Sequence, residues 1–302
     1  MHNNPLVSVI CLCYNHAPFV VEALESVLNQ TYTNVELIIA DDFSTDNSIE
    51  IIEKWLKNHP EISFVFNSQN IGNTKTFNKG LKLAIGEYII DLAADDVLRP
   101  DCIANQLKGF AESKYKNLGL VYGNAEWISE TGKHIQNYFQ TDKNGKGLVH
   151  QPTGDVYINL LNGKTKLCSV AALVKREVFD QLNGYDEKLA YEDYDLWIRT
   201  ARNYNFDYVD EILVQKRMLD DSMYTLLLQK NNSRTRRFNC STYVILKKAF
   251  ILNRNKAEFK AMLKRIRTEM KVAVHTRDFQ LLVNYISLDI KVRLKVLINR
   301  KS

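Results

Sequence analysis

The sequence predicts an α/β protein with a Rossmann-like, mostly parallel sheet, helices on both of its faces, and a helical C-terminal extension. Residues 1–100 alternate between short apolar runs and helical patterns, the order expected of a parallel sheet covered on both sides. Polar residues follow directly after several of these runs. The charge also changes along the chain: residues 1–229 contain 21 Lys and Arg against 31 Asp and Glu, and residues 230–302 contain 19 against 4.

Four runs in the first hundred residues predict buried strands, because they are short, apolar and rich in β-branched side chains. The runs are 6–13, 35–42, 62–67 and 88–96. Between them lie three helical segments whose apolar residues share one face. These segments are 19–30, 44–60 and about 74–85. We expect Ser44, Thr45 and Asp46 to cap the second helix and Gly86 to end the third.

The pattern is less regular beyond residue 100. Residues 103–113 predict a helix and residues 118–128 a strand, while the polar, Gly-rich stretch 130–155 predicts a loop over the site. A strand, a short helix and a turn at Gly184 follow, and another helix begins near Glu192. From residue 230 onward the pattern is helical and basic.

Composition narrows the class of protein. The chain is 45% hydrophobic and 25% charged, as in ordinary globular proteins. We see neither a run of about 20 apolar residues that would span a bilayer nor the pattern of a signal peptide. The five cysteines are odd in number and lack CxxC spacing, so we expect reduced, buried thiols in a cytoplasmic protein.

Two adjacent carboxylates, Asp95 and Asp96, end the fourth apolar run. Ligands of parallel sheets bind beyond the carboxyl ends of the strands, where Asn15 and Asp42 are also expected. No GxGxxG or GxxxxGK[ST] motif follows the first strand, so a bound nucleotide would need another partner for its phosphates. Mg²⁺ or Mn²⁺ on Asp95 and Asp96 could supply it. The alternative is a solvated turn.

A second acidic pair, Glu192 and Asp193, stands at the entrance of a predicted helix. A carboxylate there can act as a general base towards a hydroxyl group. The alternative is simple capping, since acidic side chains in the first turn favour the helix dipole.

These segments together resemble the family-2 inverting glycosyltransferases with the GT-A fold. The resemblance rests on VSVICLCYN, EALESVLNQTY, VELIIADDFSTDNS, GEYIIDLAADDVLRP and REVFDQLNGYDEKLAYEDYDLWIR, in this order, and covers about residues 5–225. It implies a catalytic domain over 1–229, with a nucleotide-binding half (1–100) and an acceptor-binding half (101–229). Residues 230–302 then form a basic helical C-terminal region.

The resemblance also implies roles for single residues. Asp42 is expected to read a uracil ring, Asp95 to bind Mn²⁺ or Mg²⁺ with Asp96, and Asp193 to be the catalytic base beside Glu192. The remaining donor-binding candidates are Tyr14, Asn15, Glu22, Asn70, Lys75 and Asn78.

Three positions depart from the family pattern. Ala93 stands where the first Asp of the DxD motif is expected, and Leu219 where a His is common. Phe77 replaces an Arg of the third helix, and Lys75 on the same helix could compensate or be a plain surface lysine.

The resemblance implies transfer of a sugar from a nucleotide donor, for which we expect a UDP-sugar. The acceptor would be a hydroxyl of a glycan or a polyprenyl-linked glycan in surface-polysaccharide synthesis, such as O-antigen or capsule. Thymidine and guanosine donors stay open. The alternatives are a non-catalytic nucleotide-sugar-binding protein, which Ala93 leaves possible, and a sugar nucleotidyltransferase.

The basic C-terminal region carries apolar residues at helical spacing. They are Leu282, Ile286, Ile290, Leu294 and Leu297. This pattern indicates a helix packed on the catalytic domain, a helix lying on an anionic membrane, or an oligomer contact. A membrane contact would place the protein on the inner face of the cytoplasmic membrane. Nucleic-acid binding is not expected, since it would not explain the acidic strand ends.

Overall fold

The computed structural model describes residues 4–163, 167–219 and 228–298, so the predicted C-terminal region is described except for 299–302. The chain forms two compact units. Unit 1 comprises residues 1–154, 167–187 and 205–219, and unit 2 comprises 155–166, 188–204 and 220–302. These bounds differ from the predicted division at residue 229, because two earlier segments belong with the C-terminal helices.

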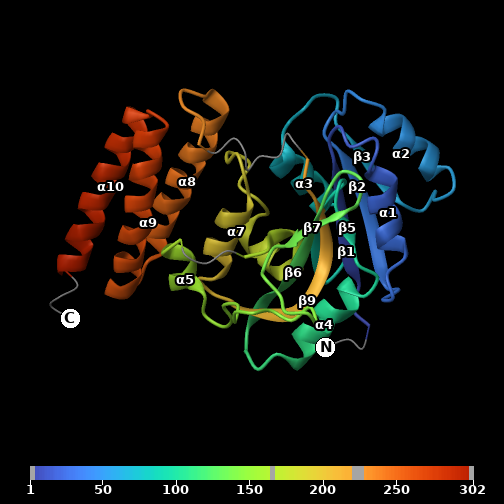
Figure 1. Ribbon diagram of the computed structural model, residues 1–302, viewed down its shortest axis with the longest axis horizontal. Coiled ribbons are helices and arrows are strands. Elements are labelled where there is room, and N and C mark those ends of the chain that lie inside the picture. The colour runs from blue at the N-terminus through green and yellow to red at the C-terminus, as the bar shows by residue number, and fades with distance from the viewer. Residues whose placement is uncertain (1–3, 164–166, 220–227, 299–302) are drawn as a thin grey trace. The chain divides into compact units, whose positions relative to one another are not determined.

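Unit 1 contains a nine-stranded sheet (Figure 1). Its strands are β1 (Val7–Cys13), β2 (Val35–Asp41), β3 (Ser63–Phe66), β4 (Tyr88–Ala93), β5 (Val97–Leu98), β6 (Leu118–Ile128), β7 (His134–Asn137), β8 (Ala172–Lys175) and β9 (Asn205–Arg217). Their order is β3-β2-β1-β4-β8-β6-β9-β5, and β7 pairs with β6. Strands β3, β2, β1 and β4 are parallel neighbours, whereas β8 runs antiparallel to both β4 and β6. The predicted fold class is confirmed.

Helices cover both faces of this sheet, as the sequence predicts. Unit 1 contains α1 (Val20–Leu28), α2 (Ser48–Leu56), α3 (Asn73–Leu81), α4 (Cys102–Glu112), α6 (Arg176–Leu182) and the 3₁₀ turn η1 (Ser169–Ala171). Side chains of α1, α2 and α4 share one buried core with alternate residues of β1, β2 and β4. On the other face, the ring of Phe77 in α3 lies 5.3 Å from that of Phe179 in α6.

The expected role of Gly86 is wrong. Helix α3 ends at Leu81, five residues before this glycine. Gly86 instead lies where a Cβ atom would stand 2.7 Å from the backbone nitrogen of Ser8 and 2.8 Å from the carbonyl oxygen of Leu6. The chain needs a glycine there because it passes so close to the start of β1.

Three strands fall outside the sequence prediction, the shortest being β5, which directly follows the predicted run 88–96. The stretch 130–155 contains β7, which pairs with β6, and the sequence pattern does not predict the thirteen residues of β9 as a strand. β9 pairs with β6 over most of its length, but the register shifts at three places. These irregularities break the alternation by which a strand is recognised in a sequence.

Unit 2 is helical. It contains α5 (Tyr157–Leu161), α7 (Asp193–Thr200), α8 (Ser233–Leu252), α9 (Lys256–His275) and α10 (Phe279–Ile298). The side chain of Asn232 accepts a hydrogen bond from the N–H of Thr235 and caps α8, and Asn255 caps α9 in the same way. The predicted helical character of the region from residue 230 onward is confirmed over residues 233–298, which form these three helices.

Polar contacts hold the two earlier segments to the C-terminal helices. Asp195 of α7 is 1% exposed, and its carboxylate binds Arg199 and Lys248, each at 2.7 Å. The hydroxyl of Tyr157 in α5 donates to Asn253 at 2.8 Å. Helices α5 and α7 are therefore part of the same folded unit as α8.

Candidate functional site

The carboxyl ends of β1, β2 and β4 meet at one edge of the sheet in unit 1. Cys13 lies opposite Asp41, and Leu12 lies opposite Ala93. The N–H of Asp42 donates to the carbonyl oxygen of Cys13 at 2.9 Å. The segments that follow these strands, which carry Tyr14, Asn15, Asp42 and Asp95, therefore begin side by side.

Asn15 shapes the loop after β2. Its backbone is left-handed, with φ of 58°, and its side-chain oxygen accepts a hydrogen bond from the N–H of Thr45 at 2.7 Å. Its own N–H donates to the hydroxyl of Ser44 at 2.9 Å. Tyr14 is 45% exposed, so its ring is available to a ligand.

Asp42 is buried, and its carboxylate accepts hydrogen bonds from the protein itself. The N–H groups of Ile71 and Gly72 each donate to it at 2.8 Å, and the amide of Asn67 donates at 3.1 Å. These bonds fix the loop that carries Asn70, whose side chain is exposed. Asp42 thus holds the loop at this edge of the sheet in place. Its expected contact with a nucleobase stays a prediction.

The two predicted donor-binding residues of α3, Lys75 and Asn78, differ in their exposure to solvent. Lys75 is exposed, whereas Lys79, one turn later, donates to Asn67 at 2.7 Å. Asn78 is 9% exposed and binds both the N–H and the carbonyl oxygen of Tyr185, at 2.9 Å each. Asn78 therefore fixes the chain after α6.

Asp95 and Asp96 have different surroundings. The Asp95 side chain is 15% exposed, and its Oδ1 lies 3.6 Å from Nδ1 of His16. Asp96 is 2% exposed, and its Oδ1 accepts a hydrogen bond from the N–H of Arg217 at 2.9 Å. Burial, followed by the negative charge of Asp95, raises the pKa of Asp96 to about 7. Protonation of one carboxyl thus relieves the repulsion between the two neighbours.

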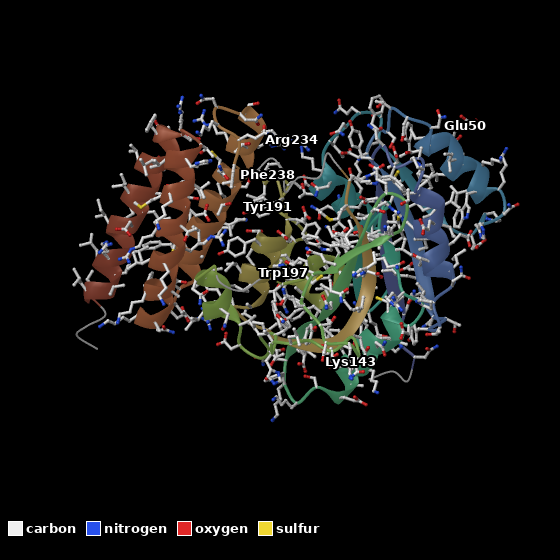
Figure 2. The ribbon with its side chains drawn as sticks, viewed as in Figure 1. Glu50, Lys143, Tyr191, Trp197, Arg234 and Phe238 are labelled. Carbon is white, nitrogen blue, oxygen red and sulfur yellow. The ribbon has the colours of Figure 1, made fainter. Side chains whose placement is uncertain are left out.

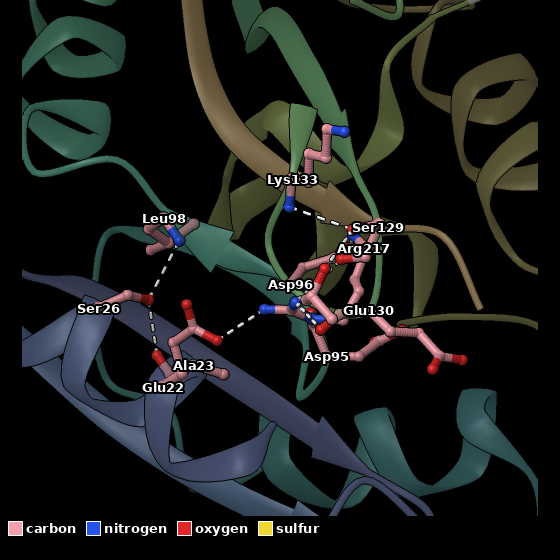
Figure 3. Close-up of polar contacts among 11 residues, drawn as sticks. Glu22, Ala23, Ser26, Asp95, Asp96, Leu98, Ser129, Glu130, Lys133 and Arg217 are labelled. Carbon is pink, nitrogen blue, oxygen red and sulfur yellow. Dashed lines mark hydrogen bonds and ion pairs between the residues drawn. The ribbon is translucent and has the colours of Figure 1, made fainter. Parts of the chain in front are cut away.

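Arg217, the last residue of β9, holds the segment after β4 in place (Figure 3). Its side chain is 2% exposed and donates to the carbonyl oxygens of Asp95 at 3.1 Å and Glu130 at 2.8 Å. It also forms an ion pair of 2.6 Å with Glu22, a predicted donor-binding residue of α1. The guanidinium group therefore ties α1, β9 and the Asp95–Asp96 turn together.

Asp91 is a further acidic residue on β4. It lies opposite Ile10 of β1, on the same face as Ala93, and is part-exposed. The hydroxyl of Tyr185 donates to it at 2.9 Å. Burial, partly offset by this hydrogen bond, raises the pKa of Asp91 to about 7. The pKa of the buried Cys11 thiol is raised by burial first, then by Cys13, and then by the charges of Asp95, Asp91 and Asp96.

The second acidic pair belongs to unit 2. Glu192 is the N-cap of α7 and Asp193 its first residue, and both are half-buried. Oδ1 of Asp193 accepts a hydrogen bond from the N–H of Tyr194 at 2.6 Å. The preceding Tyr191 stacks on Phe238 of α8 at 6.0 Å (Figure 2). The residues on either side of Asp193 are thus held by packing and a hydrogen bond, and its role as base stays a prediction.

A divalent cation would find few protein ligands in the described part of the chain. Within residues 4–163, 167–219 and 228–298, no three His, Cys, Asp or Glu side chains are grouped as a metal site. The donors beside the strand ends nevertheless suit a cation that also takes oxygens from a substrate. Nδ1 of His16 is buried without a hydrogen bond next to the part-exposed carboxylate of Asp95.

Sequence reasoning missed His16, Arg217 and Asp91. His16 could have been included, because it directly follows Tyr14 and Asn15 after the first strand. Arg217 lies on the strand that went unassigned. Asp91 could not be recognised as a site residue, because a single acidic residue inside an apolar run does not by itself indicate a function.

A groove of about 450 Å³ lies on unit 1 between α1 and the segment around β5. Its lining includes Glu22, Ser26, Leu98, Arg99 and Gln215, but not Asn15, Asp42 or Asp95. Of the predicted donor-binding residues, Glu22 is the one in this lining. In the described part of the chain, we also find no helix with the length and apolarity needed to traverse a bilayer.

Comparison with known proteins identifies the family of this chain and solved structures that share its fold. The family model "Glycosyl transferase family 2" matches residues 8–182. The chondroitin synthase of Escherichia coli is 27% identical over 231 residues, which make up 76% of this chain. The match covers only 31% of that longer protein.

Two solved structures share the fold. TarS of S. aureus in complex with UDP-GlcNAc has a TM-score of 0.69 and 16% identity, covering 95% of this chain and 81% of that chain. The mannosyltransferase PcManGT of Pyrobaculum calidifontis, in complex with GDP-Man and Mn²⁺, has a TM-score of 0.58 and 18% identity, covering 99% and 85%.

Proposed function

The chain belongs to glycosyl transferase family 2 and is therefore a glycosyltransferase, and from this premise we propose that it is an inverting enzyme that uses a UDP-sugar. The observation that carries the proposal is the group of polar residues at the aligned ends of β1, β2 and β4. Tyr14, Asn15, His16 and Asp95 have side chains there that a nucleotide sugar can reach. Family membership also removes the sugar nucleotidyltransferase alternative.

Asp95 and His16 would hold the cation of this reaction. When bound, Mn²⁺ or Mg²⁺ would offset the negative charge that develops on the diphosphate leaving group. Asp96 would support Asp95 from the buried side, since one of its oxygens already accepts the N–H of Arg217. A sugar-nucleotide complex with Mn²⁺ is known for the related fold of PcManGT.

The chain would contribute the base through Asp193. Its carboxylate would accept the proton of the acceptor hydroxyl as that oxygen attacks the anomeric carbon of the sugar. The bond to the diphosphate breaks in the same displacement, which inverts the anomeric configuration without a covalent enzyme intermediate. General-base assistance of this kind is worth about 10²–10⁴-fold in rate. Glu192, the N-cap residue, would position α7 for this step.

The acceptor is proposed to be a glycan or a polyprenyl-linked glycan at the cytoplasmic face of the membrane. The reaction would build a surface polysaccharide of the O-antigen or capsule kind. Support comes from the chondroitin synthase of E. coli, which is named for making a polysaccharide and is 27% identical to this chain over 231 residues.

A panel of sugar nucleotides tests the donor and the metal. We expect release of the nucleoside diphosphate from one UDP-sugar in the presence of Mn²⁺ or Mg²⁺, and loss of the release after chelation. The Asp193→Asn variant should bind the same donor, while transfer falls about 10²–10⁴-fold. Normal transfer by this variant would remove Asp193 from the role of base, and full activity with chelator would remove the cation.

A further inference from the structure

Helix α10 has an apolar stripe that the fold of unit 2 leaves uncovered. Six residues recur along it at intervals of four or three positions, which keeps them on one side of a straight α-helix for about five turns. They are Phe279 (65% exposed), Val283 (58%), Ile286 (43%), Ile290 (54%), Leu294 (53%) and Leu297 (53%), and we call them the α10 stripe.

The opposite side of α10 is buried in the core of unit 2. Leu281, Tyr285, Leu288 and Val292 are at most 4% exposed and belong to the core that α10 shares with α8 and α9. A helix that only needs to pack on a bundle has one apolar face and one polar face. The second apolar face of α10 therefore indicates a partner outside unit 2.

The charges around the stripe indicate what kind of partner this is. Every acidic residue of the described range 228–298 is paired with an arginine of unit 2. Glu258 pairs with Arg202 at 3.1 Å, Glu269 with Arg265 at 2.7 Å, Asp278 with Arg236 at 3.0 Å, and Asp289 with Arg293. Lys291 and Lys295 are exposed on the flank of α10 between the stripe and the buried face. The C-terminal region thus presents a cationic excess, with 19 Lys and Arg against 4 Asp and Glu over residues 230–302.

We propose that the α10 stripe lies on an anionic membrane surface, with its apolar side chains at the level of the lipid headgroups and acyl chains and the lysines against lipid phosphates. An apolar stripe beside cationic side chains is the pattern of a helix that lies in the membrane interface. A second copy of the chain fits less well, because it would bring two strongly cationic regions together. The inference rests on the proposed acceptor at the membrane and places the protein itself on that surface. It does not depend on the identity of the donor or of the catalytic base.

Sedimentation with lipid vesicles tests the surface directly. We expect the full-length protein to pellet with vesicles of phosphatidylcholine mixed with phosphatidylglycerol, much less with phosphatidylcholine alone, and less at high salt. The double variant Val283→Glu/Ile290→Glu should lower the partition coefficient about tenfold or more, since it puts charge into the buried face of the contact. Both positions are exposed, so the helical bundle should be unaffected, which circular dichroism checks.

A matched control places the same two changes on unit 1. Ile135 and Leu148 are 50% and 60% exposed, and the variant Ile135→Glu/Leu148→Glu adds the same charge. It should bind vesicles like the unchanged protein. Equal binding by the stripe variant, or no preference for anionic lipid, would overturn the proposal. A dimer in solution that the stripe variant dissociates would assign the stripe to a second copy instead. Donor hydrolysis by the same preparations reports on the glycosyltransferase proposal separately.

Discussion

Asp91 has a pKa well above the usual range of an aspartate. It sits inside an otherwise apolar strand, two positions before Ala93, and its carboxylate accepts a hydrogen bond from the hydroxyl of Tyr185 at 2.9 Å. Its raised pKa of about 7 means that the folded protein holds a proton which the unfolded chain has lost. This residue therefore costs stability at neutral and higher pH.

We predict that Asp91→Asn changes the pH dependence of stability. The folded state binds more protons than the unfolded state between the ordinary pKa of about 4 and the raised value, so stability falls as pH rises through that window. Asparagine removes this loss. The free energy of unfolding of the variant should exceed that of the unchanged protein by about 1–3 kcal/mol at pH 8 but not at pH 4.

Urea unfolding across this pH range measures the difference. Tyr185→Phe is the matched control, because it removes the hydrogen bond that partly offsets burial and should steepen the fall with pH. An identical pH dependence in Asp91→Asn and the unchanged protein would show that the carboxyl ionises normally in the folded state.

At the scale of elements, the end of β9 organises the site more than any helix does. Arg217 reaches α1 through Glu22 and the turn after β4 through the carbonyl oxygen of Asp95. A planar guanidinium group can satisfy several acceptors at once, whereas an ammonium group cannot reproduce this arrangement. The position of Asp95 therefore depends on a strand that ends more than a hundred residues later.

We predict that Arg217→Lys destabilises the protein and weakens donor binding together. Loss of several buried charged contacts should lower the free energy of unfolding by about 2–4 kcal/mol. Arg99→Lys is the matched control, since the Arg99 side chain is 45% exposed and lies 3.8 Å from Glu126. A surface pair of that kind is worth less than about 1 kcal/mol. Equal effects of the two changes on urea unfolding would contradict the proposed role of Arg217.

At the scale of the whole molecule, the two units are interleaved along the chain. The C-terminal helices share a unit with residues 155–166 and 188–204, and the contacts of Asp195 and Tyr157 with α8 are buried or part-buried. The basic region is consequently no simple appendage to the preceding 229 residues.

We predict that a chain ending at residue 229 does not keep the structure around α7. Removing α8 takes Lys248 from the buried carboxylate of Asp195 and leaves apolar faces of α5 and α7 without cover. Limited proteolysis should then cut within residues 155–163 and 188–204, where we expect the full chain to resist. A shortened chain with the protease resistance of the full protein over those ranges would show that α5 and α7 fold without α8.

The sequence was enough to predict the fold class, the first four strands and the acidic ends of two of them. These features are local: hydrophobic periodicity identifies a strand, and a parallel sheet aligns the strand ends at one edge. The side chains that follow β1, β2 and β4 at this edge therefore follow from the pattern, whereas the order of the strands does not. The family resemblance also rested on such local motifs.

Tertiary structure alone decided the features that depend on distant partners. β9 escaped prediction because its register shifts against β6 break the alternation, and Arg217 was missed with it. The raised pKa values of Asp91 and Asp96 come from burial, which no stretch of sequence displays. The second apolar face of α10 could be distinguished from a core face only once Leu281, Tyr285 and Val292 were seen to fill the other side. Burial and long-range packing are properties of the folded chain, and a sequence constrains them only through the structure that it forms.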